Sequence, residues 1–309
     1  MTRAVVFAYH NVGVRCLRVL LDQGVDVALV LTHEDSPNET IWYDSVAQVC
    51  SDRGIPTITP DDANAPDVVA RIRALAPDFI FSFYYRKMLG AELLGIPGRG
   101  ALNMHGSLLP KYRGRVPVNW AVLHGERETG ASLHYMEIKP DAGNLVAQTA
   151  VPILDDDTAF EVFQKVTVAA ELTLARALPQ LVAGTAPSVP LDLKAGSYFS
   201  GRKPEDGRID WSQPAAAVNN LVRAVAPPYP GAFTDVGTMR IVVARSRVTR
   251  PDASAPTPAQ FIGQVARAAD GALGFVCGDG ALLVPLRLII GDTPLDATAS
   301  QAWLATVKQ

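Results

Sequence analysis

The sequence predicts an α/β protein whose predominantly parallel sheet is covered by helices and is followed by a smaller β-barrel domain. The first half of the chain alternates short apolar runs with amphipathic segments, as strands and helices do around a parallel sheet. The last third consists of short apolar runs separated by Gly and Asp turns. With 309 residues, 48% of them hydrophobic, the chain can bury two cores, and we place the domains at residues 1–203 and 204–309.

The first domain begins as a strand–helix–strand unit. Residues 4–8 form an apolar run typical of a buried strand, Val14 and Leu17 start a stripe at helical spacing, and residues 27–31 form the next strand. The same patterns predict further helices at 45–53, 67–75 and 118–124, and further strands at 79–83, 101–105, 131–136 and 146–152.

A long amphipathic helix over residues 158–182 is expected to close this domain. Its apolar stripe starts with Phe160 and Phe163, the acidic run 155–157 favours its N-terminus, and Gly184 ends it.

The second domain follows a polar stretch rich in Gly and Pro, residues 196–207. It starts with a helix at residues 214–224, and residues 251–258 are typical of a linker. Strands are expected at 240–244, 261–266, 273–277 and 281–289, which together predict a small barrel.

The composition indicates a soluble protein of a reducing compartment. No apolar stretch approaches the roughly 20 residues of a membrane span. The N-terminus runs into the first strand without a signal-peptide pattern, so we expect a cytoplasmic location and no membrane partner. Cys16, Cys50 and Cys277 lack metal-ligand spacing, which predicts free core thiols and no metal site. A net charge of -3 gives no general attraction to nucleic acid.

The first strand-to-helix turn, residues 8–13, lacks the Gly-x-Gly-x-x-Gly pattern that cradles a pyrophosphate. This absence disfavours a dehydrogenase. Within the turn, Asn11 is either the N-cap of the helix or a ligand contact, and His10 has no assigned role.

Asn103 and His105 end a predicted strand, at the edge of an open α/β sheet where ligands bind. Side-chain alternation places them on one face. A histidine at a strand end is more often structural, but the loop 106–114 contains two glycines and a proline, which favours a close approach of backbone and ligand. The other histidines lack such a loop, so we expect surface or core roles for His33, His124 and His134.

Asp141 follows in a second turn, residues 137–143, that contains glycine. An amide, an imidazole and a carboxylate fit acyl transfer to an amine. The amide N–H can hold a developing oxyanion, the imidazole can move a proton, and the carboxylate can orient the imidazole and favour its charged form. None of these steps needs a metal.

Three cations, Lys111, Arg113 and Arg115, lie on the loop that follows His105. Each alone is typical of a solvated surface, whereas the three together favour a contact with a diphosphate or a carboxylate. Tyr84, Tyr85 and Trp120 are either packing residues or a wall for a flat ring.

These motifs resemble the folate-dependent formyltransferases. The resemblance covers essentially the whole chain and is strongest for members that formylate the 4-amine of a UDP-linked aminopentose. It implies a Rossmann-like first domain that binds 10-formyltetrahydrofolate and a C-terminal domain of the oligonucleotide-binding-barrel type. It is carried by residues 79–86, 105–115, 117–120, 223–226 and 230–233, together with Asn103 and Asp141.

The resemblance also implies a role for each site residue. His105 is the expected general acid/base, Asn103 stabilises the oxyanion, and Asp141 raises the basicity of His105. The expected sugar-nucleotide contacts are Tyr9, Arg113, Asn119 and Trp120. The expected folate contacts are Lys87, Met88, Leu89, Arg115, Glu137, Ile138, Lys139, Pro140 and Asp141, with the main chain favoured over side chains from 137 to 141.

Other functions stay open. A methionyl-tRNA acceptor is disfavoured because RNA binding requires phosphate neutralisation. The loop 32–50 has no Lys or Arg, and residues 204–309 carry nine Lys and Arg against nine Asp and Glu. A non-catalytic binding protein is disfavoured because all three catalytic residue types are present. Many relatives carry a fused decarboxylase, and the chain ends at Gln309, so we expect a separate decarboxylase as a pathway partner. The oligomeric state is left open.

Overall fold

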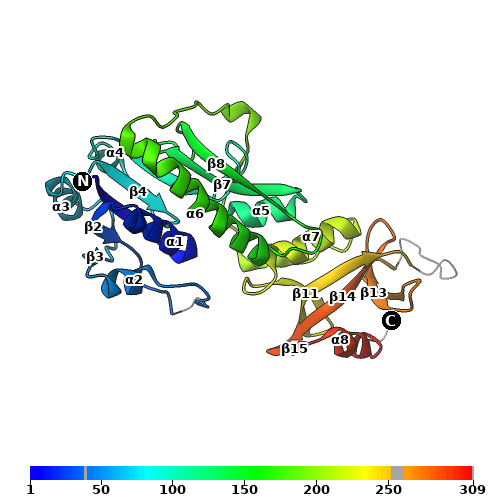
Figure 1. The fold of residues 1–309 in the computed structure, drawn as a ribbon. Coiled ribbons are helices and arrows are strands. Elements are labelled where there is room, and N and C mark those ends of the chain that lie inside the picture. The colour runs from blue at the N-terminus through cyan, green and yellow to red at the C-terminus, as the bar shows by residue number, and fades with distance from the viewer. Residues whose placement is uncertain (38–39, 252–260, 308–309) are drawn as a thin grey trace. The chain divides into compact units, whose positions relative to one another are not determined.

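The computed structural model describes residues 1–37, 40–251 and 261–307. It contains two compact units that interleave along the chain. The first comprises residues 1–117, 128–152 and 163–200, and the second comprises residues 118–127, 153–162 and 201–309. Each unit has its own sheet (Figure 1).

The first unit is built on a seven-stranded sheet in the order β3-β2-β1-β4-β5-β7-β8. The first five strands along the chain run parallel, and β7 is antiparallel to both of its neighbours. The predicted α/β class with a predominantly parallel sheet is therefore confirmed. The strands are β1 (Arg3–Ala8), β2 (Asp26–Leu31), β3 (Thr57–Ile58), β4 (Phe79–Phe83), β5 (Ala101–His105), β7 (Glu128–Tyr135) and β8 (Leu145–Pro152).

Helices cover both faces of this sheet. On one face α1 (His10–Asp22) and α6 (Ala159–Ala183) lie next to each other (Figure 1). Arg15 Nε of α1 forms an ion pair of 2.6 Å with Glu171 Oε2 of α6. On the other face α3 (Pro66–Ala74) buries Val69 and Ile72 against apolar side chains of β1, β2 and β4. All five residues of β4 are buried, as expected of a central parallel strand. The remaining elements are α2 (Val46–Asp52), α4 (Ala91–Leu94), and the short pair β6 (Arg113–Gly114) and β9 (Tyr198–Phe199).

The strand order of the sheet reverses between β1 and β4. The chain adds β2 and β3 on one side of β1 and adds β4, β5, β7 and β8 on the other side. In open α/β sheets, ligands bind beyond the carboxyl ends of strands near such a point. The carboxyl ends of β4 and β5 are therefore where a site is expected.

The second unit contains an antiparallel half-barrel sheet in the order β10-β11-β14-β13-β12, with β15 on β14, which confirms the predicted barrel-type domain. Its helices include α5 (Pro117–Leu123), most of which belongs to this unit, and α7 (Ala215–Val225). The strands are β10 (Ala232–Val236), β11 (Met239–Thr249), β12 (Val265–Arg267), β13 (Leu273–Val276), β14 (Leu282–Ile290) and β15 (Thr293–Leu295), followed by α8 (Ala297–Leu304).

Two local predictions for these elements need correction, and one helix was not predicted. Asn11 is not the N-cap of α1, because the helix starts at His10 and the Asn11 side chain accepts a hydrogen bond from the Asp44 N–H at 2.8 Å. The strand predicted at 261–266 begins only at Val265. The helix α8 was not predicted, although Asp296 caps it by accepting from the Ala299 N–H at 2.8 Å. The linker predicted at 251–258 lies, apart from Pro251, outside the described residues.

Among the described residues, α6 is the one helix long and apolar enough to cross a membrane. Half of its most apolar window is buried inside the protein. A buried core helix of a globular protein has the same length and hydropathy, and the apolar stripe of α6 that contains Phe163 and Val166 is buried.

Candidate active site

The last strand residues of β5 bring an amide and an imidazole to the carboxyl edge of the sheet. His105 is buried, with 6% of its surface exposed, whereas Asn103 is the one residue of β5 that is partly exposed. The antiparallel neighbour β7 pairs Asn103 with His134 and His105 with Ser132. This register places two polar side chains of β7 beside the two predicted site residues.

Asp141 lies next to His105. Its Oδ1 atom is 3.5 Å from His105 Nδ1, and its Oδ2 atom accepts a hydrogen bond from the Gly114 N–H at 2.8 Å. Asp141 has a φ of 50°, a left-handed conformation that an aspartate adopts at a cost. The structure therefore holds this carboxylate in place from two sides, by the imidazole and by the backbone of the basic loop.

His134 completes the cluster, and sequence reasoning did not assign it to the site. It is 2% exposed, its Nε2 atom is 3.2 Å from Asn103 Nδ2, and the same Nε2 is 3.5 Å from Asp141 Oδ1. Asn103, His105 and Asp141 are thus brought together, with His134 between the amide and the carboxylate. The signal for His134 is the register of two antiparallel strands, which depends on the fold and not on local sequence.

Burial alone would raise the pKa of the Asp141 carboxyl. The neighbouring His105 imidazole, the nearby His134 imidazole and the Gly114 N–H outweigh burial, so that the pKa of Asp141 lies well below its ordinary value. The carboxylate is consequently ionised at neutral pH and favours a proton on a neighbouring imidazole.

The loop after β5 holds the other side of the His105 ring. His105 Nε2 is 2.7 Å from the Tyr112 carbonyl oxygen, so Nε2 carries a hydrogen and donates it. The Ser107 hydroxyl donates to the Lys111 carbonyl at 2.6 Å, and the Ser132 hydroxyl donates to the Ser107 carbonyl at 2.6 Å. These bonds fix the loop from β7 and from within, and they fix the imidazole with it.

Two glycines of this loop are required by close contacts. A Cβ atom on Gly106 would collide with the Tyr84 hydroxyl, and a Cβ atom on Gly114 would collide with the Phe199 carbonyl. Gly114 also has a φ of 98°, which side chains other than that of glycine rarely allow. The glycines were expected to let a ligand approach the backbone closely, whereas the contacts that require them in the structure are with the Tyr84 hydroxyl and the Phe199 carbonyl.

The residues expected to bind folate fall into two loops that flank one hydrophobic cluster. Leu89 is buried in that cluster and Met136 packs against it. Met88 is 56% exposed, and the Lys87 ammonium donates to the Pro60 and Asp61 carbonyls. Arg115, an expected folate contact outside these two loops, has an exposed side chain. Its backbone N–H donates to the Phe199 carbonyl at 3.0 Å.

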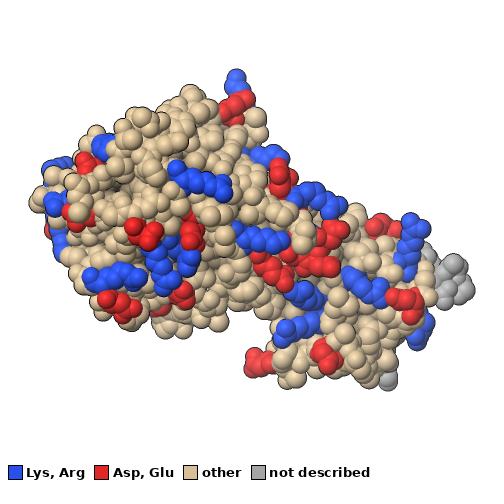
Figure 2. Space-filling view, in the orientation of Figure 1, with Lys and Arg blue, Asp and Glu red and all other residues tan. Residues whose placement is uncertain are grey.

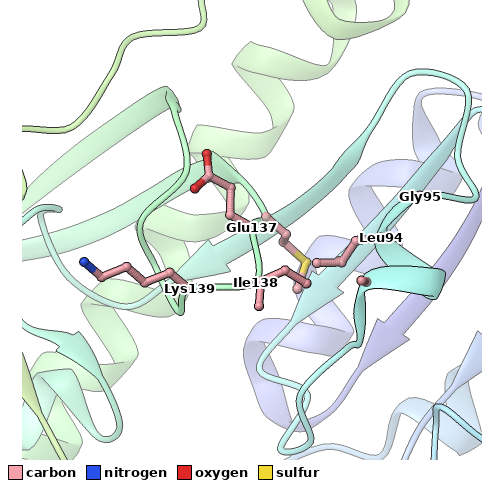
Figure 3. A pocket seen from close by; sticks show the side chains of 7 residues that line it. Leu94, Gly95, Glu137, Ile138 and Lys139 are labelled. Atoms are coloured by element: carbon pink, nitrogen blue, oxygen red, sulfur yellow. The ribbon is translucent and has the colours of Figure 1, made fainter.

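An open pocket of about 500 Å³ lies between α4 and the loop after β7. In Figure 3, Leu94 and Ile138 face each other across it, and the charged ends of Glu137 and Lys139 point away from them. Ile138 is 62% exposed, so this wall of the pocket presents apolar surface to solvent. Glu137, Ile138 and Lys139 thus line a pocket, whereas Pro140 and Asp141 lie next along the chain. The pocket is lined by Ala91, Leu94, Gly95, Met136, Glu137, Ile138 and Lys139.

Asn64 holds the first of these loops, which the sequence did not indicate. Its side-chain amide donates to the Met88 carbonyl at 3.0 Å, and its side-chain oxygen accepts from the Gly90 N–H at 2.6 Å. One amide side chain therefore pairs with the backbone of residues 88–90 as a neighbouring strand would.

The sugar-nucleotide contacts expected from the resemblance have mixed environments. Tyr9 is 4% exposed, and its hydroxyl donates to Asp35 Oδ1 at 2.6 Å, while burial and this bond raise its pKa. Arg113 is 8% exposed, and its Nε atom has no hydrogen-bond partner among the described residues. Asn119 and Trp120 belong to the second unit, where the Asn119 amide donates to the Ala224 carbonyl at 2.7 Å.

Tyr85 and His33 pack together near the end of β4. Their rings stack with centroids 4.2 Å apart, and His33 Nε2 accepts a hydrogen bond from the Arg86 N–H at 3.0 Å. Burial, together with Lys87 and Arg86, lowers the pKa of His33 to about 4. His33 is therefore neutral at physiological pH and partly buried, and Tyr85 packs against it.

The described residues contain no group of three or more His, Cys, Asp or Glu side chains able to hold a metal ion. Cys16, Cys50 and Cys277 are buried free thiols, and burial raises the pKa of each. Thiols in this state are protonated at neutral pH and are poor nucleophiles.

Comparison with known families and structures gives a consistent result. The sequence model of a protein family described as formyl transferase matches residues 10–178. A second family model, described as formyl transferase, C-terminal domain, matches residues 202–299.

Three solved structures show the same fold at low sequence identity. An N-formyltransferase from Helicobacter canadensis, solved with folinic acid and dTDP-3-aminofucose, is 19% identical with a TM-score of 0.67, over 92% of this chain and 99% of that chain. A 4-N formyltransferase from Francisella tularensis is 18% identical with a TM-score of 0.65, over 79% and 96%. Glycinamide ribonucleotide transformylase 1 from Symbiobacterium toebii is 20% identical with a TM-score of 0.53, over 61% and 94%.

Proposed function

The chain belongs to the formyl transferase family, and we propose that it transfers a formyl group from 10-formyltetrahydrofolate to the amine of a nucleotide-linked amino sugar. The observation that carries the proposal is the contact of 3.5 Å between His105 Nδ1 and the ionised Asp141, beside the partly exposed amide of Asn103. This arrangement offers a proton carrier and an oxyanion donor at one sheet edge.

The reaction we propose begins with the sugar amine. Its nitrogen attacks the formyl carbon, the carbonyl electron pair moves to oxygen, and the Asn103 N–H donates to the oxyanion. His105 takes the proton that the attacking nitrogen loses, and Asp141 stabilises the imidazolium. The bond from the formyl carbon to N10 of the folate then breaks, N10 takes the electron pair and a proton from His105, and the products are a formamide and tetrahydrofolate.

The pocket beside α4 supports folate as the formyl donor. Its apolar side chains, Leu94, Met136 and Ile138, suit a flat aromatic ring, and Lys139 offers a cation for a carboxylate. Of the residues in its wall, 137–139 coincide with expected folate contacts. The relative from Helicobacter canadensis was solved with folinic acid, a formylated folate.

An amino sugar is favoured as the acceptor over tRNA. The match to the Helicobacter canadensis enzyme, solved with dTDP-3-aminofucose, covers 92% of this chain, so both units of this chain have a counterpart in that enzyme. On the face in Figure 2, Lys and Arg side chains of the described residues are interspersed with Asp and Glu and form no continuous basic band. Binding an RNA backbone requires such a band.

Within this class we propose UDP-4-amino-4-deoxy-L-arabinose as the acceptor, in a step of lipid A modification that takes place in the cytoplasm. The support is the sequence resemblance at residues 79–86, 105–115 and 117–120. A separate decarboxylase would then supply the amine precursor. We also propose residues 1–203 and 204–309 as the limits of the catalytic and C-terminal domains.

A panel assay tests the proposal. The protein is incubated with 10-formyltetrahydrofolate and, in separate reactions, with UDP-4-amino-4-deoxy-L-arabinose, dTDP-amino sugars and methionyl-tRNA, and the formylated product is measured by mass spectrometry. We expect transfer to the UDP-aminopentose and none to methionyl-tRNA. Transfer to a dTDP-amino sugar alone would replace the sugar and base that we propose. Strongly salt-dependent transfer to methionyl-tRNA, with no transfer to any sugar, would refute the amino-sugar proposal.

A further inference from the structure

His134 is a buried residue that touches two members of the catalytic cluster without being one of the residues to which the mechanism assigns a step. It stands opposite Asn103 on the neighbouring strand, and 2% of its surface is exposed. Its Nδ1 atom lies near a backbone carbonyl, and its Nε2 atom lies near the side chains of Asn103 and Asp141.

The hydrogen bonds of His134 indicate which nitrogen carries its proton. Nδ1 is 2.7 Å from the Tyr135 carbonyl oxygen, which can only accept, so Nδ1 must donate. In a neutral imidazole the other nitrogen, Nε2, then has a lone pair. The Asn103 amide nitrogen, at 3.2 Å, is a donor that this lone pair can accept.

This pairing sets the orientation of the Asn103 amide. Of the two hydrogens on Asn103 Nδ2, one is used by His134, and the second remains available on the same nitrogen. Asn103 is the one partly exposed residue of β5, so this second hydrogen can be donated to a bound ligand. If His134 were protonated at both nitrogens, Asn103 would have to present its oxygen to Nε2, and its nitrogen would leave this position.

We propose that His134 is a positioning residue: its neutral form, with the proton on Nδ1, holds the Asn103 amide so that one N–H points at the oxygen of the formyl group. Asp141 Oδ1, 3.5 Å from Nε2, is the competing neighbour. His105 Nδ1 is 3.5 Å from the same carboxylate oxygen, and when His105 takes the proton during the transfer it supplies the cation that Asp141 favours, so this role needs no second proton on His134. The inference rests on the proposed formyl transfer for its kinetic part only.

A spectroscopic measurement tests the geometry without any substrate. The protein has five histidines, and ¹⁵N labelling with the His134→Gln variant assigns the signals of residue 134. We expect the two nitrogens of His134 at pH 7.5 to show one protonated Nδ1 and one unprotonated Nε2. A doubly protonated ring, or a proton on Nε2, would refute the inference.

Kinetics of two variants then test the positioning role. His134→Ala removes the acceptor of the Asn103 N–H, and we expect kcat to fall roughly tenfold to a hundredfold, with the KM for the folate changed less than threefold, since an oxyanion donor that is lost outright costs about 10² to 10³ in rate. His134→Gln can place an amide oxygen near the position of Nε2, and we expect it to recover at least part of the lost kcat.

Thr129→Val is the matched control, because Thr129 is a buried polar residue of the same strand whose hydroxyl has no partner among the described residues. Melting temperatures identify variants that fail to fold. A folded His134→Ala with the kcat of the control, or a His134→Gln no more active than His134→Ala, would refute the positioning role. If the wild-type protein formylates no acceptor of the panel, the proposed function fails, and the nitrogen spectrum alone decides the state of His134.

Discussion

Asp141 is a single carboxylate that two imidazoles share. Oδ1 lies 3.5 Å from a nitrogen of His105 and 3.5 Å from a nitrogen of His134, and Oδ2 is bound by the Gly114 N–H. A carboxylate with so many favourable partners has a lowered pKa, and it contributes to folding as well as to the chemistry of the site.

His105→Ala should lower kcat by roughly 10² to 10⁴, because positioned proton transfer contributes about this much to a rate. The KM for 10-formyltetrahydrofolate should change little, since the proton moves only in the transition state. Steady-state kinetics measure both values, and His124→Ala, at an exposed histidine, is the control. A kcat equal to that of the control would exclude His105 from the mechanism.

Asp141→Asn should lower the free energy of unfolding in a pH-dependent way. The pKa of Asp141 is lower in the folded protein, so its stabilisation is fully present above the ordinary carboxyl pKa near 4 and is lost as the pH falls below it. Urea unfolding at pH 7 should show a loss of about 2 kcal/mol for the variant, and the difference from wild type should shrink between pH 4 and pH 3. Asp61→Asn, an exposed change, should show no such trend; a difference that is constant with pH would contradict the assignment.

At the scale of elements, the site depends on how strands and loops are held to one another. Among the residues that the structure describes, no strand pairs with the loop after β4, and the Asn64 side chain instead bonds the backbone of Met88 and Gly90. The loop after β5 is held by Ser132 of β7. Helices and strands set the positions of the loops, and single polar side chains set their shape.

Asn64→Ala should raise the KM for 10-formyltetrahydrofolate several-fold, because it frees the backbone of residues 88–90, while kcat should fall less than twofold. Two lost hydrogen bonds at an exposed site are worth roughly 1 to 3 kcal/mol in total, part of which appears as weaker folate binding. Folate titrations followed by fluorescence give the affinity directly. Arg71→Ala on the exposed side of α3 is the control, and an unchanged folate affinity in Asn64→Ala would show that this loop does not contribute to binding.

The sequence predicted well those elements whose pattern is local. Strands 79–83 and 101–105 were expected at their observed limits; the first is an apolar run broken only by Ser82, and the second has Ala101, Leu102 and Met104 as its apolar residues. His134 was missed because its role follows from a strand pairing that joins residues far apart in the chain. Asn11 was left open between a helix cap and a ligand contact, because local sequence cannot show that its side chain accepts a hydrogen bond from the Asp44 N–H. The helix α8 escaped detection because its eight residues carry no clear apolar stripe.

At the scale of the whole molecule, the first unit supplies the cluster of Asn103, His105 and Asp141 and the pocket beside α4. The second unit is a separate antiparallel half-barrel with its own helices. The family matches extend over both, at residues 10–178 and 202–299. The family and the fold agree, and the identity of the acceptor amine is what experiment must determine.

Transfer by the purified protein should be insensitive to chelators. The proposed steps use an amide, an imidazole and a carboxylate, and none of them requires a Lewis acid. Initial rates measured before and after dialysis against EDTA, and again after addition of Zn²⁺ or Mg²⁺, should agree within about twofold. Activity that is lost on dialysis and restored by one of these ions would show that the mechanism lacks a component.

The three buried cysteines have a practical consequence. Their thiols are protonated and inaccessible, so the folded protein offers maleimide reagents almost no native target. A cysteine introduced at Ile138, which is 62% exposed in the wall of the pocket, can therefore carry a fluorophore as the single labelled site. The natural protein is already a background on which ligand entry into that pocket can be followed in real time.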